Sequence, residues 1–278
     1  MTDRSALPGQ MPNAFVPGQG NLSPEDQALV ARRQAAMGPA YRLFYETPVH
    51  LVRGEGVWLY DADGQAYLDT YNNVASVGHC HPRVVEAMAR QAAVFASHTR
   101  YLHEGILAYS ERLLGYFPPD LSQVMFTCTG SEANDLALRI AEAHTGGTGI
   151  IVTENAYHGV TRAIAAMSPS LGAGAALGEN VRVVPAPDPL RLEGDLGQAF
   201  AAHVQAAIDD MVGKGIKPVA LIVDTIFSSD GVFADPKGFL APAVAAIRKA
   251  GGLFIADEVQ PRSEEHTSEL QSQFRISY

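Results

Sequence analysis

An eight-residue segment, Thr127 to Asn134, combines residue types that suit the binding of an anion. Its letters are T-C-T-G-S-E-A-N, and it stands where an expected strand turns into an expected helix. Gly130 lets the backbone turn closely, and Ser131 and the first free N–H groups of the helix point beyond its end, where a phosphate fits. The alternative is that Ser131 only caps the helix while Glu132 complements its dipole.

A second segment, Glu154 to Thr161, follows the next expected strand and therefore opens on the same edge of the sheet. Its letters are E-N-A-Y-H-G-V-T. Tyr157 offers a flat ring, His158 a hydrogen-bond donor and Gly159 room for a planar ligand. An aromatic side chain in a loop more often serves packing, so this segment alone is weak evidence.

Asp257 supplies a carboxylate at a third strand end. The run Gly251 to Gln260, G-G-L-F-I-A-D-E-V-Q, is typical of a buried strand with Asp257 and Glu258 at its carboxyl end, where α/β sheets bind ligands. A carboxylate there is costly unless water or a cation meets it. A phosphate site, a ring for stacking and a carboxylate for a protonated ring nitrogen together describe a pocket for pyridoxal 5′-phosphate. We expect Glu258 to brace the strand end instead of touching substrate.

The elements that must position these segments alternate between helices and short β-branched strands. This alternation predicts an α/β fold with a mostly parallel sheet between helices. The expected helices are Pro82 to Ala96, Gly105 to Tyr116, Ser131 to Thr145, a short one near Val160, Gly194 to Val212 and Phe239 to Ala250. The expected strands are Gln123 to Thr127, Gly149 to Thr153, Val181 to Val184, Val219 to Asp224 and Leu253 to Ala256.

The N-terminal part of the chain has a different pattern. Ser23 and Pro24 predict the start of a helix that runs to about Met37. Val57 to Asp69 predicts a β-hairpin with Gly64 in its turn. The N-terminal elements therefore predict a small lobe that contains both a helix and strands.

The expected division has four parts: a mobile arm over residues 1–22, the helix and hairpin lobe over 23–80, an incomplete large domain over 81–261, and a tail over 262–278. The tail is polar and lacks the strand and helix rhythm of the preceding chain. Its letters from Arg262 to Ser272 resemble the conceptual translation of a sequencing adaptor. We therefore expect the tail to be non-native and to form no part of the fold.

The composition limits the classes of protein and partner. With 278 residues and 47% apolar content, the chain can bury a sizeable core. A formal charge of −10 without a basic cluster disfavours a nucleic acid partner. Only two cysteines, Cys80 and Cys128, favour a reducing compartment. Since no signal-peptide core and no apolar run of membrane-spanning length is found, we expect a cytoplasmic protein without a membrane partner.

The segments that suggest a pocket also resemble the class III aminotransferases, which are fold-type I enzymes that depend on pyridoxal 5′-phosphate. The matching segments follow the family's order and spacing: Asn73 to Pro82 (NVASVGHCHP), Gly130 to Leu138 (GSEANDLAL), Ala156 to Gly159 (AYHG) and Phe254 to Gln260 (FIADEVQ). The resemblance implies the fold-type I large domain and the N-terminal part of a small α+β domain. It also implies a homodimeric transaminase that moves an amino group from an amine or amino acid to a keto acid.

The resemblance further implies which residues hold the cofactor. Gly130 and Ser131 would hold its phosphate, Tyr157 would stack on the pyridine ring, and Asp257 would pair with the ring nitrogen. Asp257 is the catalytic residue of this set, because it would raise the pKa of the ring nitrogen. Each unit of that increase is worth about 1.4 kcal/mol of preference for the protonated ring. His158 completes the set together with two residues beyond the strand end, Val259 on the opposite ring face and Gln260 at the phenolic oxygen.

A lysine that forms the Schiff base with the cofactor is a further part of the resemblance. In the family it follows the matching aspartate by a few dozen residues. All lysines of this chain precede Asp257, namely Lys214, Lys217, Lys237 and Lys249. We therefore expect the chain as written to be truncated before that lysine and catalytically inactive.

The substrate is less well defined, because the chain departs from the family pattern. Val160 stands where relatives that take ω-amino carboxylates often have an arginine. The segments Asn72 to Pro82 and Ser97 to His103 are similar to those of phospho-lyases of phosphorylated amino alcohols. Asn72 and Arg100 are candidate substrate residues, and Arg100 can equally form a structural ion pair. Such a lyase on the same cofactor is the alternative function, and a non-functional truncated fragment is another.

Two rival classes are weaker. His79, Cys80 and His81 suggest a metal site, but alternate residues of an extended segment point opposite ways and no second ligand pair has zinc-like spacing. The letters L-F-I-A-D-E resemble the magnesium strand of P-loop proteins, yet G-x-x-x-x-G-K-[S/T] occurs nowhere in the chain. We therefore expect no metal site and no nucleotide-binding loop.

Overall fold

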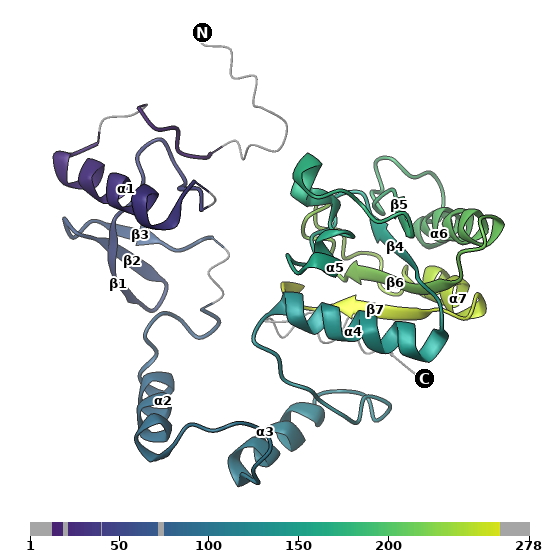
Figure 1. The fold of residues 1–278 in the computed structure, drawn as a ribbon, viewed down its shortest axis with the longest axis horizontal. Helices are drawn as coiled ribbons and strands as arrows, with labels where there is room; N and C mark the ends of the chain where they lie inside the picture. The colour runs from purple at the N-terminus through teal and green to yellow at the C-terminus, as the bar shows by residue number, and fades with distance from the viewer. Residues whose placement is uncertain (1–12, 19–21, 40, 72–74, 262–278) are drawn as a thin grey trace. The chain divides into compact units, whose positions relative to one another are not determined.

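A computed structural model describes residues 13–18, 22–39, 41–71 and 75–261. The chain divides into two compact units, Met1–Tyr101 and Leu102–Tyr278 (Figure 1). The predicted tail and most of the predicted arm lie outside the described residues. The predicted domain boundaries stay predictions.

The first unit contains helices and a small antiparallel sheet. Helix α1 (Pro24–Met37) begins as predicted, since the Ser23 hydroxyl oxygen accepts a hydrogen bond from the N–H of Asp26 at 3.1 Å. The predicted hairpin forms from β2 (Trp58–Asp61) and β3 (Ala66–Leu68), and Gly64 in its turn has a φ of 84°. A strand that the sequence analysis did not expect, β1 (Leu51–Glu55), pairs with β2, and helix α2 (Pro82–Val94) follows the sheet.

The second unit is an α/β layer structure, as predicted. Its sheet has the order β5-β4-β6-β7, and all of its neighbouring strands are parallel. The strands are β4 (Gly149–Thr153), β5 (Val181–Val184), β6 (Pro218–Asp224) and β7 (Leu253–Asp257). The helices are α3 (Glu104–Leu114), α4 (Gly130–Thr145), α5 (Arg162–Ala165), α6 (Leu196–Gly213) and α7 (Ala241–Lys249), with a 3₁₀ turn at Pro169–Gly174.

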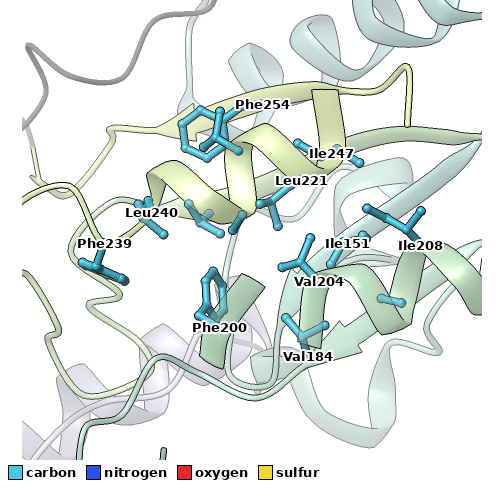
Figure 2. Packing of buried hydrophobic residues seen from close by; sticks show 14 of the residues in the cluster. Ile151, Val184, Phe200, Val204, Ile208, Leu221, Phe239, Leu240, Ile247 and Phe254 are labelled. Atoms are coloured by element: carbon cyan, nitrogen blue, oxygen red, sulfur yellow. The ribbon is translucent and has the colours of Figure 1, made fainter. Parts of the chain in front are cut away.

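Alternate residues of each strand face opposite layers of the core. On one side the strands pack against α6 and α7 through a cluster that includes Phe200, Leu221 and Phe254 (Figure 2). On the other side they pack against α4 through a cluster that includes Leu138, Val152 and Ile222. Because both faces are covered, the strands read as continuous apolar runs, which is why their positions are evident in the sequence.

The expected strand Gln123–Thr127 does not form, so this prediction is wrong. The segment pairs with no strand among the described residues, and the Met125 side chain is 68% exposed. Apolar character favours a half-buried pleated surface but does not supply the ladder of hydrogen bonds that defines a strand. The segment instead leads directly into α4.

The strand order places a topological switch point between β4 and β6. From β4 the chain continues to β5 on one side, whereas from β6 it continues to β7 on the other. Ligands of open α/β sheets bind outside the carboxyl ends of the strands at such a point. In the part of the chain that the structure describes, no helix is long and apolar enough to cross a membrane.

Candidate functional site

The side chain of Asp257 lies at the carboxyl end of β7 and is 6% exposed. Its Oδ2 atom accepts hydrogen bonds from Nδ2 of Asn134 at 2.9 Å and, across 2.8 Å, from Nδ1 of His158. Its Oδ1 atom accepts one from the N–H of Val259 at 3.1 Å. A carboxylate offers about four acceptor positions, so these three contacts orient the group and leave room for a further donor.

The start of α4 lies at the same edge of the sheet. Thr129 caps this helix, because its hydroxyl oxygen accepts a hydrogen bond from the N–H of Glu132 at 3.1 Å. The alternative reading in which Ser131 is the cap is therefore wrong. The Ser131 hydroxyl oxygen instead accepts from the N–H of Val160 at 3.1 Å. With Thr129 as cap, the N–H groups of Gly130 and Ser131 belong to the first turn, which is suited to an anion.

Two glycines allow the segments of the site to approach one another. A Cβ atom on Gly130 would lie 2.6 Å from Cγ2 of Val259. A Cβ atom on Gly159 would lie 2.3 Å from Oγ of Ser131, and Gly159 also has a φ of 133°, a conformation that favours glycine. The turn into α4, the loop after β4 and the end of β7 are thus packed directly against one another.

Other predicted cofactor residues lie in the same loops with exposed side chains. Tyr157 is 42% exposed and Val259 is 55% exposed, so both offer apolar surface to a ligand. Gln260 is also exposed, whereas the His158 side chain is fully buried. The Nε2 atom of His158 has no hydrogen-bond partner among the described residues.

The structure does not test the two candidate substrate residues. Asn72 lies outside the described residues. Arg100 is exposed in the first unit, where its backbone N–H donates to the His98 ring at 3.2 Å. The Arg100 guanidinium forms no ion pair within the described ranges. Both assignments stay predictions.

Asn134 is a site residue whose role the sequence analysis missed. Its buried side-chain amide donates both to Asp257 Oδ2 and to the backbone carbonyl of His158, each at 2.9 Å. One side chain of α4 therefore ties the loop after β4 to the end of β7. Its position in the G-S-E-A-N run, one helical turn after Gly130, was the available signal, because residues at that spacing share a helix face.

Asp224, at the end of β6, stands in register beside Asp257 on β7. Burial raises the pKa of the Asp224 carboxyl, and the negative charge of Asp257 adds to this, while hydrogen bonds from Ser228 and from the N–H of Ile226 act in the opposite direction. The neighbouring Glu258 accepts a hydrogen bond from the Thr225 hydroxyl at 2.7 Å, which agrees with the predicted bracing role.

The loop after β4, residues 154–161, is here named the β4 loop, and residues 225–233 are named the β6 loop. Both carboxylate oxygens of Asp230, in the β6 loop, accept hydrogen bonds from the β4 end: from the Thr153 hydroxyl at 2.6 Å and from the N–H of Asn155 at 2.9 Å. Glu154 forms an ion pair with Arg191, which follows β5. The β4 loop is therefore fixed from both neighbouring strands.

His79, which was considered above as a metal ligand, has a structural role. His79 Nε2 lies 2.7 Å from Oδ2 of Asp69, which ties the segment before α2 to the small sheet. Across the described ranges, no three metal-ligating side chains come together as a candidate metal site.

Comparisons with known proteins identify the family of this chain. The class-III aminotransferase family matches residues 43–261. A protein of Drosophila melanogaster described as alanine–glyoxylate aminotransferase 2-like is 37% identical over 240 residues, which cover 82% of this chain and 49% of the relative. The ethanolamine-phosphate phospho-lyase homolog 1 of Caenorhabditis elegans is 31% identical over 252 residues, or 84% of this chain and 54% of the relative.

Two solved structures are similar to this chain. A phospholyase from Arthrobacter in complex with phosphoethanolamine has a TM-score of 0.79 and 42% identity, and the match covers 84% of this chain and 56% of that one. An (S)-enantioselective omega-transaminase from Thermomicrobium roseum has a TM-score of 0.71 and 25% identity, with 83% and 56% covered. The chain spans about half the length of these relatives. It belongs to the class-III aminotransferase family, with the fold-type I architecture.

Proposed function

We propose that the whole protein is a pyridoxal 5′-phosphate-dependent transaminase that moves an amino group from an amine or amino acid to a keto acid. The observation that carries this proposal is the convergence of three segments on one sheet edge: the start of α4, the β4 loop and the Asp257 carboxylate at the end of β7. Family membership supports it.

The residues present fit pyridoxal 5′-phosphate, the cofactor of this family. The first-turn N–H groups at Gly130 and Ser131 suit its phosphate. The exposed faces of Tyr157 and Val259 suit a flat ring, and the remaining acceptor position of Asp257 suits a protonated ring nitrogen. When bound, the cofactor supplies an electron sink for the carbanion that forms when a substrate α-proton is lost.

The chain's own residues then have separable tasks. Asp257 would hold the proton on the ring nitrogen, because a carboxylate near that atom favours its charged form. Asn134 and His158 orient the carboxylate through hydrogen bonds to Oδ2. The N–H of Val259 holds the other oxygen, Oδ1. Ser131 would contribute both its backbone N–H and its hydroxyl proton to the phosphate, since the hydroxyl oxygen already accepts from Val160.

Lys214, Lys217 and Lys249 do not suit covalent attachment of the cofactor. Lys217 directly precedes β6, and its Nζ donates to the carbonyl oxygen of Thr145 at the end of α4. Lys249 ends α7 just before β7. Lys214 pairs with Asp210 on α6. These three lie at the amino ends of the strands, whereas the candidate site lies at the carboxyl ends.

A second candidate, elimination of phosphate from a phosphorylated amino alcohol, is favoured by one observation. The Arthrobacter phospholyase, solved with phosphoethanolamine, is 42% identical to this chain. Both reactions would use Asp257 and the first-turn N–H groups at Gly130 and Ser131 to hold the cofactor, so the residues of the site fit either reaction.

A comparison of products decides between the two. The longest polypeptide that the gene encodes would be assayed with phosphoethanolamine and with amines plus a keto acid. Amino-group transfer that requires the keto acid supports the transaminase, whereas release of inorganic phosphate without a keto acid supports the lyase. Absence of both activities, with no binding of pyridoxal 5′-phosphate, refutes the proposed function.

We further propose a homodimer in the cytoplasm, with a small-molecule amino donor and a keto acid as partners. The family resemblance supports the dimer, and the low cysteine content supports a reducing compartment. One relative is named as a mitochondrial protein of Arabidopsis thaliana, so cell fractionation is the measurement that checks the location.

A further inference from the structure

We propose that Asp230 is a positioning residue, which fixes the start of the β4 loop and thereby the place of the Tyr157 ring against the cofactor. This inference rests on the proposed function, since it assigns a role to a residue outside the pocket in binding the same cofactor. Asp230 does not belong to the segments that carry the family resemblance, and no role in the site was expected for it.

The contacts of Asp230 bracket one residue at the β4 end. Oδ2 accepts from the hydroxyl of buried Thr153, and Oδ1 accepts from the backbone N–H of Asn155. Hydrogen bonds to an ionised acceptor are about twice as strong as neutral ones. Tyr157 follows only two residues after Asn155, so the direction in which the chain leaves β4 decides where the ring lies.

The far end of the β4 loop is fixed by other contacts. The His158 ring meets Asp257, and the N–H of Val160 donates to Ser131. Tyr157 therefore lies between two fixed points, one made by Asp230 and the other made by the site residues themselves. Without the hydrogen bonds to Asp230, only the contacts of His158 and Val160 would hold the loop segment that carries the Tyr157 ring.

The β6 loop is a rigid support for Asp230. The Phe227 ring is fully buried and packs edge to face against Phe200, with ring centroids 5.9 Å apart. The Phe227 carbonyl oxygen accepts from the N–H groups of three successive residues, 230, 231 and 232. Phe227 and Val232 both have positive φ, at 55° and 66°, conformations that persist only where the surroundings hold them.

The sheet topology explains why such a contact is needed. β4 and β6 are neighbours, but the chain leaves them toward opposite sides, so their loops diverge at the switch point. Asp230 joins the two loops across this divergence. It sets the spacing between the β4 loop, which carries Tyr157, and the β6–β7 side of the sheet, which carries Asp257.

The test is a double-mutant cycle on the full 278-residue chain, with pyridoxal 5′-phosphate titrated by absorbance and by the circular dichroism of the bound cofactor. The variants are Asp230→Asn, Tyr157→Leu and their combination. An asparagine keeps the size of the side chain but loses one acceptor oxygen. We expect Asp230→Asn to weaken binding about tenfold in the presence of Tyr157. In the Tyr157→Leu background the same change should alter the Kd less than about twofold.

Equal weakening in both backgrounds overturns the proposal, because a merely structural residue acts independently of the ring. An unchanged Kd for Asp230→Asn also overturns it. Asp209→Asn, on the exposed side of α6, is the control for the loss of one carboxylate and should leave the Kd unchanged. If Asp230→Asn does not fold, Thr153→Val replaces it, with Thr153→Ser as the variant that retains the hydroxyl and should restore binding.

Failure of the proposed function is distinguishable. If the unmodified chain does not bind pyridoxal 5′-phosphate, amide hydrogen exchange is measured over residues 155–160 without cofactor. Faster exchange of these amides in Asp230→Asn, with unchanged exchange in β7, supports the positioning role while the proposed function fails. Unchanged exchange over residues 155–160 overturns the positioning role as well.

Discussion

Nδ1 of His158 lies 2.8 Å from Oδ2 of Asp257, although the two residues stand 99 positions apart in the chain. The contact joins the β4 loop to the end of β7, and Asn134 donates to the same oxygen atom from α4. The carboxylate that the proposed function needs is therefore held from two sides before any ligand arrives. Preorganised charges of this kind need no reorganisation when a ligand binds.

Asp257→Asn should weaken the binding of pyridoxal 5′-phosphate at least about tenfold, because an amide no longer favours a protonated ring nitrogen. Titration of the cofactor by absorbance measures the change. Glu258→Gln is the matched control, since the Glu258 carboxylate accepts a hydrogen bond from the Thr225 hydroxyl, and it should stay within about twofold. Equal losses in the two variants would contradict the role of Asp257.

Gly130→Ala should destabilise the fold by about 1–3 kcal/mol, because the new methyl group overlaps the Val259 side chain. Urea unfolding gives the free energy. Val259→Ala removes the overlapping methyl groups, so the double variant should recover part of the loss. If the double variant is no more stable than Gly130→Ala alone, the close packing of these two residues is not the cause.

Gly159→Ala should be destabilising by about 1–3 kcal/mol for two reasons, the overlap with Ser131 and the positive φ of Gly159. Removing the hydroxyl in Ser131→Ala relieves only the first. We therefore expect incomplete recovery in the double variant, in contrast to the Gly130 and Val259 pair. Full recovery by Ser131→Ala would show that the backbone conformation of Gly159 costs nothing.

Asp224 should make the stability of the fold depend on pH. Burial raises the pKa of its carboxyl above the unfolded value of about 3.9, so the folded protein holds this proton more tightly than the unfolded chain. Its contribution to stability is fully present below the unfolded pKa and is lost as pH rises through the folded pKa. Asp224→Asn should therefore gain stability relative to the unmodified chain as the pH rises above about 4.

Chemical denaturation at several pH values measures this difference. Asp209→Asn, an exposed carboxylate of α6, serves as the control for the removal of one charge. A difference between Asp224→Asn and the unmodified chain that does not change with pH would refute the prediction.

Reduction with borohydride in the presence of pyridoxal 5′-phosphate should label none of Lys214, Lys217 and Lys249 stoichiometrically. The reason is that Lys214, Lys217 and Lys249 lie at the strand edge away from the candidate site. Peptide mass spectrometry locates any label. Complete labelling of any of these three lysines would place the cofactor elsewhere than we propose.

The elements that bury apolar side chains on a regular period were predictable from the sequence. Strand β4 is buried at every position, and Val181–Val184 was predicted to the residue. The strand expected at Gln123–Thr127 shares this apolar character but pairs with no other strand in the described part of the chain. Local sequence indicates that a segment can join a sheet, whereas pairing depends on which other segment lies beside it.

The site was predictable where several unusual residue types stood together, as in the segments around Gly130 and Tyr157. Asn134 and Asp230 were not recognised, because their importance lies in contacts with residues 123 and 77 positions away. An isolated asparagine in a helix or aspartate in a loop has many ordinary uses, such as caps and turns. Only the folded backbone shows that both residues hold the β4 loop.

The hydrogen bond between Asn134 and Asp257 can form only after both residues have been synthesised. The ribosome synthesises the start of α4 long before it synthesises β7, since 123 positions separate Asn134 from Asp257. Contacts so distant in sequence form late, because the intervening chain must first collapse around them. The ability to take up the cofactor should thus appear in a newly made chain only after β7 has joined the sheet.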